Sequence, residues 1–196
     1  FVFSFKVPDS ITIKKYPAVS SFGNKAGTLN EFFLDDHLFK FGFLRPLEAI
    51  REKVGALIFE FSHFHANDYA HGREFVDQLD HFLSQLPSDW QYAVEVRNRN
   101  LLHPEYFEML GKHGVAHIYN QWTLMPPVSE QLQMHPPENN PFIFGRFLLT
   151  PGRSFDSARR LFEPFNRLQE IDPDAREAFV RLVRAAVAKE DNPFPS

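Results

Sequence analysis

The sequence predicts an α/β protein with a TIM-like (β/α) barrel fold. Strand-like and helical segments alternate along the whole chain of 196 residues. Successive strands lie about 25 to 45 residues apart, a spacing typical of βαβ crossovers. Because such crossovers are right-handed, we expect the strands to lie parallel in one sheet. No glycine-rich phosphate turn follows the first strand, so part of a barrel fits the pattern better than a dinucleotide-binding fold.

Five short segments have the composition of strands. The first ends at Pro8, which has no backbone N–H to donate to a sheet. The second is a continuous apolar run with one acid, as in a strand that is covered on both faces. The pattern predicts strands at 1–7, 56–61, 92–96, 115–119 and 142–149.

Helical segments lie between these strands and after the last one. Thr28 can cap the first helix, and Pro46 suits the first turn of the second. The third is amphipathic, with Phe75, Leu79 and Phe82 on one side. A Pro-rich loop is expected at 125–141. The predicted helices are 29–39, 46–53, 73–86, 104–110, 155–168 and 173–189.

Composition argues against several classes of protein. A formal net charge of −4 does not favour nucleic-acid binding. The absence of cysteine excludes disulfides, a thiol nucleophile and a Cys-ligated metal. No apolar run reaches the length of about 18 residues that a membrane span needs, so we expect no membrane segment and a cytoplasmic location.

The length predicts a single α/β-barrel domain over residues 1–196. A typical closed barrel needs about 250 residues, so we expect this domain to be a fragment of a longer chain. The residues at 191–196 have the composition of a loop.

Candidate functional residues follow from where the strands end. In α/β barrels the functional groups cluster at the carboxyl ends of the strands. On this basis we expect catalytic roles for Lys6, Glu60 and Glu95, with either glutamate as general acid/base. The expected substrate-binding residues are Arg97, Asn98, Asn120, Trp122, Arg146 and Arg153.

Several of these candidates also have structural interpretations. Glu95 and Arg97 share a face, so they form either a structural ion pair or an arginine fork beside an acid/base. Lys6 is interpreted as a desolvated amine of lowered pKa, an anion contact or a snorkelling surface lysine. Arg153 follows Gly152 at the start of a helix, where it would add a further anion contact.

Histidines near the second strand do not predict a metal site. His63 and His65 would share a face if that strand continued. A metal site needs further ligands at other strand ends, and no aspartate ends any predicted strand. We therefore expect ordinary loop histidines and no metal, and the sequence does not identify a cofactor.

An ordered set of motifs resembles the YecE-like family, the domain of unknown function 72. The motifs are Phe3-Ser4-Phe5-Lys6-Val7-Pro8, Val54-Gly55-Ala56-Leu57-Ile58-Phe59-Glu60-Phe61, Val94-Glu95-Val96-Arg97-Asn98, Asn120-Gln121-Trp122, Met125-Pro126-Pro127, and Arg146 followed by Pro151-Gly152-Arg153. The resemblance covers nearly all of the chain. It implies a TIM-like barrel whose opening strand precedes Phe1 and whose closing strand follows Ser196.

The resemblance also implies which residues belong to the site. It places the family's Lys, Glu and two Arg residues at Lys6, Glu95, Arg97 and Arg146. The chain departs from the pattern in having Ile13, Glu60, Ser62-His63 and Asn98, where many members have His, Gln, a Pro pair and His. The family has no established activity, so the resemblance predicts fold and site but not reaction.

Together these features predict an enzyme that acts on an anionic or polyol small molecule at the carboxyl ends of the strands. The alternative is a non-catalytic protein that uses the same basic residues to bind a nucleotide or a nucleic-acid end. The sequence leaves open whether the protein is catalytic, and it does not predict an oligomeric state.

Overall fold

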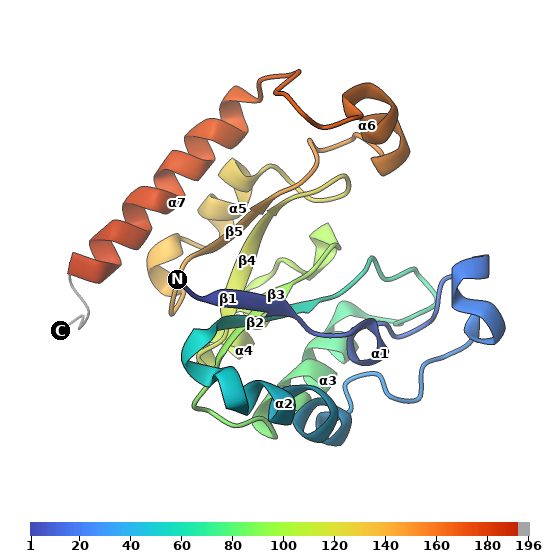
Figure 1. Cartoon of the computed structure of the whole chain (residues 1–196). Helices are drawn as coiled ribbons and strands as arrows, with labels where there is room; N and C mark the ends of the chain where they lie inside the picture. The colour runs from blue at the N-terminus through green and yellow to red at the C-terminus, as the bar shows by residue number, and fades with distance from the viewer. Residues whose placement is uncertain (192–196) are drawn as a thin grey trace. The chain divides into compact units, whose positions relative to one another are not determined.

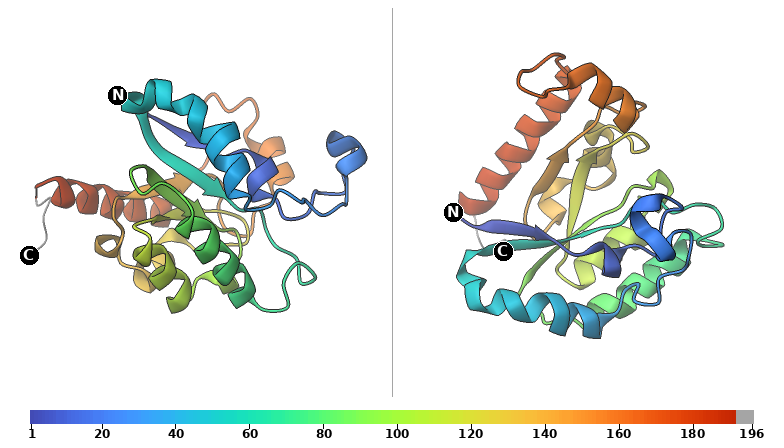
Figure 2. Two further views of the ribbon diagram at one scale, coloured as in Figure 1. Left: turned by 90° about the horizontal axis from the view of Figure 1, so that it is seen from below. Right: turned by 45° about the vertical axis from the view of Figure 1, so that its right-hand side comes forward.

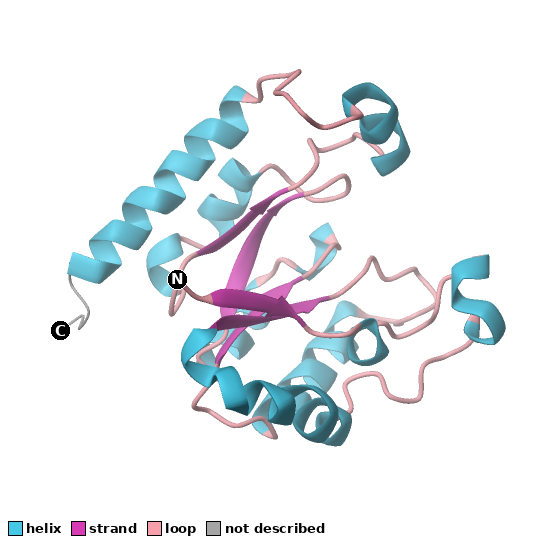
Figure 3. Cartoon of the chain, viewed as in Figure 1, coloured by secondary structure: helices cyan, strands magenta, loops and turns pink. Residues whose placement is uncertain are grey.

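The computed structural model describes residues 1–191, with side chains to Glu190. Residues 192–196, where most of the expected terminal loop falls, lie outside the described part. The chain divides into two compact units, Phe1–Val96 and Arg97–Ser196, called unit 1 and unit 2 below. Figure 1 labels their helices and strands, and Figure 3 colours them by type.

The strands of unit 1 run parallel in the order β1, β2, β3. They span Phe3–Lys6, Val54–Glu60 and Gln91–Glu95. Their helical elements are α1 (Asp9–Thr12), η1 (Ser20–Lys25), η2 (Leu38–Leu44), α2 (Arg45–Leu47), η3 (Glu48–Lys53) and α3 (Gly72–Ser84). Each predicted strand of this unit is therefore present, within two residues of its expected ends.

One face of the β2–β3 sheet packs against helices. The Phe59 ring lies 5.2 Å from that of Phe39 in η2 and 5.3 Å from that of Phe82 in α3. Tyr92 of β3 joins them, with its ring 5.8 Å from Phe59. Because side chains alternate along a strand, Glu60, the residue after Phe59, points to the opposite face of the sheet.

The helical part between β1 and β2 differs from the prediction. A helix at 29–39 capped by Thr28 was expected, but residues 31–34 form turns and Leu34 has a positive φ of 55°. The cap is Asp35, whose Oδ1 accepts from the N–H of Leu38 at 2.6 Å. Helical structure then continues to Lys53, so the expected second helix at 46–53 is the end of a longer run.

Unit 2 contains the parallel strands β4 (Ala116–Gln121) and β5 (Phe144–Phe147). Its helical elements are η4 (Arg99–Leu101), α4 (Pro104–Lys112), α5 (Val128–Met134), η5 (Pro137–Asn139), α6 (Phe155–Phe162) and α7 (Pro173–Asp191). In the views of Figures 1 and 2, α7 runs alongside β5. The core between these elements contains Tyr119, Val128, Leu132, Ala178 and Leu182.

Two predictions in unit 2 were wrong in detail. The segment at 125–141 was expected to be a loop but contains α5, whose Val128, Gln131 and Leu132 are buried. This i, i+3, i+4 spacing is helical, and flanking prolines obscured it. Helix α6 ends at Phe162 and not at 168, because Glu163 precedes Pro164 and a residue before proline disfavours helical backbone.

Both units confirm the α/β class, with parallel strands flanked by helices. The TIM-like barrel, expected to be incomplete in this chain, and the single domain over 1–196 stay predictions. Among residues 1–191, no helix is both long enough and apolar enough to cross a bilayer.

Candidate functional site

Lys6 ends β1 as a paired cation. Its Nζ lies 3.0 Å from Asp9 Oδ1 and 3.4 Å from Glu60 Oε1. Burial lowers the pKa of Lys6, but the hydrogen bond to Asp9 and the charges of both carboxylates outweigh it and raise the pKa above its usual value. The predicted alternative of a lowered pKa is therefore wrong, and Lys6 is positively charged at neutral pH.

Glu60 and Glu95 occupy equivalent positions at the ends of adjacent strands. They are register partners in the parallel pair of β2 and β3, so both side chains project to the face opposite the Phe59 cluster. Neighbouring strands are about 4.8 Å apart. Glu60 is 8% exposed and Glu95 is 0% exposed. The sheet thus holds two buried carboxyl groups side by side.

Unit 2 begins with a stacked arginine. The guanidinium carbon of Arg97 lies 3.9 Å from the ring centroid of Trp122, directly after β4. Stacking uses the face of the guanidinium and not its N–H edges, which form the fork that suits carboxylate and phosphate oxygens. Asn98 is buried beside it in the chain, at 7% exposure.

Asn120 and Arg146 lie together on one face of unit 2. They are register partners in β4 and β5. The next residues, Gln121 and Phe147, project to the opposite face, where Phe147 packs against the core. Each unit therefore carries its predicted polar residues on the face that is turned away from its helices.

A buried amide on α5 fixes the backbone at Asn120. Gln131 Nε2 donates to the Asn120 carbonyl at 2.7 Å, and its Oε1 accepts from the Asn120 N–H at 3.1 Å. The same Nε2 donates to the Pro126 carbonyl at 2.7 Å. Gln131 was not predicted from the sequence, although its helical spacing with Val128 and Leu132 was the available signal.

Arg153 is engaged by its own unit. Its Nη1 lies 2.6 Å from Glu170 Oε2, and its guanidinium carbon lies 5.0 Å from the Phe162 ring centroid. Gly152 has a positive φ of 81°. The first turn of α6 is capped by Ser154, whose Oγ accepts from the N–H of Ser157. A role for Arg153 in anion binding stays a prediction.

The histidines do not lie where a strand would align them. His63 and His65 are exposed in the loop after β2, with ring centroids 5.4 Å apart. His117 is fully buried within β4. Within residues 1–191, no group of three or more His, Asp or Glu side chains is arranged to hold a metal ion.

Other residues of the site were not predicted from the sequence. Asp9 follows the proline that ends the first predicted strand, and it lies three residues after Lys6, within reach of its ammonium group. Asn140 brackets His117: its Oδ1 accepts from the His117 N–H at 2.9 Å and its Nδ2 donates to the His117 carbonyl at 3.0 Å. No sequence signal marked Asn140, because its partner is 23 residues away.

Fold and site together define a class: α/β proteins with parallel strands that carry charged groups at the strand ends. The chain belongs to the DUF72 family, since the family described as "Protein of unknown function DUF72" matches residues 1–190. This confirms the family predicted from the sequence motifs. A search of curated proteins gave no match.

A solved structure shows a similar fold. It is a DUF72 family protein from Thermotoga maritima, with a TM-score of 0.55 and 18% sequence identity. The similarity covers 95% of this chain but 64% of that one. The chain thus spans less than two thirds of the length of this relative.

Proposed function

We propose that the protein is an enzyme that acts on an anionic or polyol small molecule, with Glu60 or Glu95 as general acid/base. The observation that carries this proposal is the pair of buried carboxyl groups at equivalent positions of β2 and β3. Like charges directly opposite each other on adjacent strands destabilise a sheet. Burying a carboxylate also costs free energy, so packing alone does not account for this pair.

Two carboxyl groups at equivalent positions of adjacent strands can supply one acid and one base for a proton transfer. Lys6 stays charged beside Glu60 and neutralises part of the local negative charge. In this role Lys6 orients Glu60 and offers N–H donors to a substrate oxygen.

Unit 2 carries candidate ligand-binding groups of its own. Arg97 is held flat by Trp122, so its planar fork is preorganised for a carboxylate or phosphate. Arg146 adds a second cation and Asn120 an amide beside it on the same face. Amide, carboxylate and guanidinium groups also suit the hydroxyls of a polyol.

A metabolite-library screen tests this function. Thermal shifts of the 196-residue chain identify compounds that bind the folded state, and product formation is then followed for each hit. We expect hits to be phosphate esters, carboxylates or polyols, and at least one of them to be converted. Hits that bind without conversion would favour a non-catalytic nucleotide-binding protein, and hits confined to uncharged apolar compounds would contradict both interpretations.

A further inference from the structure

Unit 2 contains a cavity on the helix-covered face of the β4–β5 sheet. Gln121 and Phe147 line it, and these residues project away from the face that carries Asn120 and Arg146. The cavity volume is about 900 Å³, within the range of about 300–1,000 Å³ that is typical of small-molecule sites. The cavity therefore lies on the opposite face of this sheet from the unit 2 residues of the proposed function.

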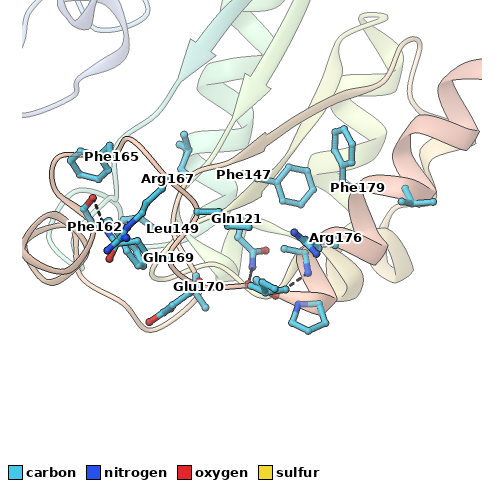
Figure 4. A pocket seen from close by; sticks show the side chains of 18 residues that line it. Gln121, Phe147, Leu149, Phe162, Phe165, Arg167, Gln169, Glu170, Arg176 and Phe179 are labelled. Carbon is cyan, nitrogen blue, oxygen red and sulfur yellow. Dashed lines mark hydrogen bonds between the residues drawn. The ribbon is translucent and has the colours of Figure 1, made fainter.

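The walls of this cavity are apolar. Figure 4 shows Phe147 of β5 beside Phe179 of α7, with ring centroids 5.8 Å apart, and Phe162 and Phe165 in the other part of the cavity. Phe165 is 63% exposed and Phe179 is 55% exposed. Soluble proteins rarely leave such a concentration of apolar surface open to water.

The acidic groups of the lining already have partners. Glu170 Oε2 is 2.6 Å from Arg153 Nη1. Asp172 Oδ2 accepts from Gln121 Nε2 at 3.0 Å, and its Oδ1 accepts from the N–H of Ala175 at 3.0 Å. Glu170 thus has a cation as its partner, whereas both partners of Asp172 are neutral donors.

The basic groups of the lining have no such partners in the described part of the chain. Among residues 1–191, the guanidinium groups of Arg167 and Arg176 form no ion pair or hydrogen bond. Figure 4 places Arg176 beside Gln121 and Phe179, and Arg167 beside Phe162. The cavity therefore combines apolar walls with two guanidinium groups, those of Arg167 and Arg176.

We propose that this cavity binds an amphipathic anion, a free small molecule with an apolar chain and one terminal carboxylate. Phe147, Phe179 and Phe162 would contact the chain, because aromatic rings provide large rigid apolar surfaces. Arg176 binds the carboxylate, since a charge-assisted hydrogen bond from a guanidinium is the strong contact available there. Arg176 lies on the regular helix α7, which limits the conformational entropy that is lost on binding.

Isothermal titration calorimetry of the 196-residue chain tests the proposal, with decanoate as the probe below its micelle concentration. Butyrate has the same carboxylate and a short chain, and 1-decanol has the chain without the charge. We expect decanoate to bind at least about tenfold more tightly than either compound. Only decanoate both contacts the apolar walls with its chain and places a carboxylate at Arg176. Equal binding of decanol and decanoate would overturn the assignment of the charge.

Matched variants locate the contact. Arg176→Gln should weaken decanoate binding about tenfold, and Phe179→Ala should weaken it without changing the preference for decanoate over decanol. Arg181→Gln is the control, because Arg181 is exposed on the same helix and does not line the cavity. If Arg176→Gln binds decanoate as Arg181→Gln does, the proposal fails.

Absence of decanoate binding up to about millimolar concentration would also overturn the proposal. Light scattering on the same sample then shows whether a second copy of the chain covers the cavity. Circular dichroism of each variant confirms that it is folded.

Discussion

At the scale of single residues, His117 is an uncharged histidine within the core of unit 2. Its Nδ1 lies 3.3 Å from the hydroxyl oxygen of Tyr106, and the ring is fully buried. Burial, with a smaller contribution from the charge of His135, lowers the pKa of His117 to about 3. The unfolded chain takes up this proton below a pH of about 6.5. Stability is therefore full above that pH and falls as the pH drops from about 6.5 toward 3.

We predict that this single group removes about 2 kcal/mol of stability between pH 7 and pH 5. Urea unfolding at both pH values measures it. His117→Phe keeps an aromatic ring at the site and should lose this part of the pH dependence. His81→Gln is the control, since His81 is exposed on α3 and should behave like wild type. A His117→Phe variant with the wild-type pH dependence would show that His117 does not titrate between the two states.

Arg97 provides a second residue-scale prediction, which concerns anion binding. Inorganic phosphate and citrate are expected to raise the melting temperature of the wild-type chain. Arg97→Lys keeps the charge but loses both the planar fork and the stacking on Trp122, so most of this gain should disappear. Arg99→Lys is the control, because Arg99 pairs with Glu130 at 2.6 Å and is mostly exposed. Equal thermal shifts for the two variants would exclude Arg97 from the anion site.

At the scale of elements, the side chain of Gln131 on α5 forms hydrogen bonds with the backbone of β4. Gln131 is 1% exposed and satisfies the N–H and carbonyl of Asn120. Gln131→Leu leaves these buried backbone groups without that partner, so the free energy of unfolding should fall by about 3 kcal/mol. Gln133→Leu, exposed on the same helix, should change it by about 0.5 kcal/mol or less. Similar denaturation midpoints for both variants would contradict the role assigned to Gln131.

The elements also show what the sequence could predict. The strands were located well because a continuous apolar run as short as that around Phe59 is typical of a buried strand. The helix expected after Thr28 was wrong, because a local capping pattern cannot reveal that Leu34 adopts a positive φ and that Asp35 caps instead. Helix α5 was missed because its seven residues are flanked by prolines, which indicate a loop when considered alone.

The candidate site was predictable only in part. The rule that functional groups follow strand ends identified Lys6, Glu60 and Glu95, and the register of β2 and β3 places the two glutamates opposite each other. Contacts between side chains that are distant in sequence were not accessible. The sign of the Lys6 pKa shift depends on Asp9 and Glu60 together, and the position of Asn120 depends on Gln131.

At the scale of the whole molecule, the family match spans residues 1–190, whereas the similar T. maritima structure is longer than this chain. The activity of the complete protein is accordingly a proposal, and it depends most on the carboxyl pair of unit 1. This pair is the feature that a catalytic interpretation needs and that a binding protein does not.

The turnover of a converted library compound by Glu95→Gln tests this central claim most directly. Gln keeps the shape of the side chain but cannot exchange a proton, so turnover should fall by about 100-fold or more. Glu52→Gln, an exposed change in η3, should keep the wild-type rate, and thermal melts show whether each variant is folded. Glu60→Gln is measured alongside, and wild-type turnover by both folded variants would contradict the account and leave the carboxyl pair with a structural role.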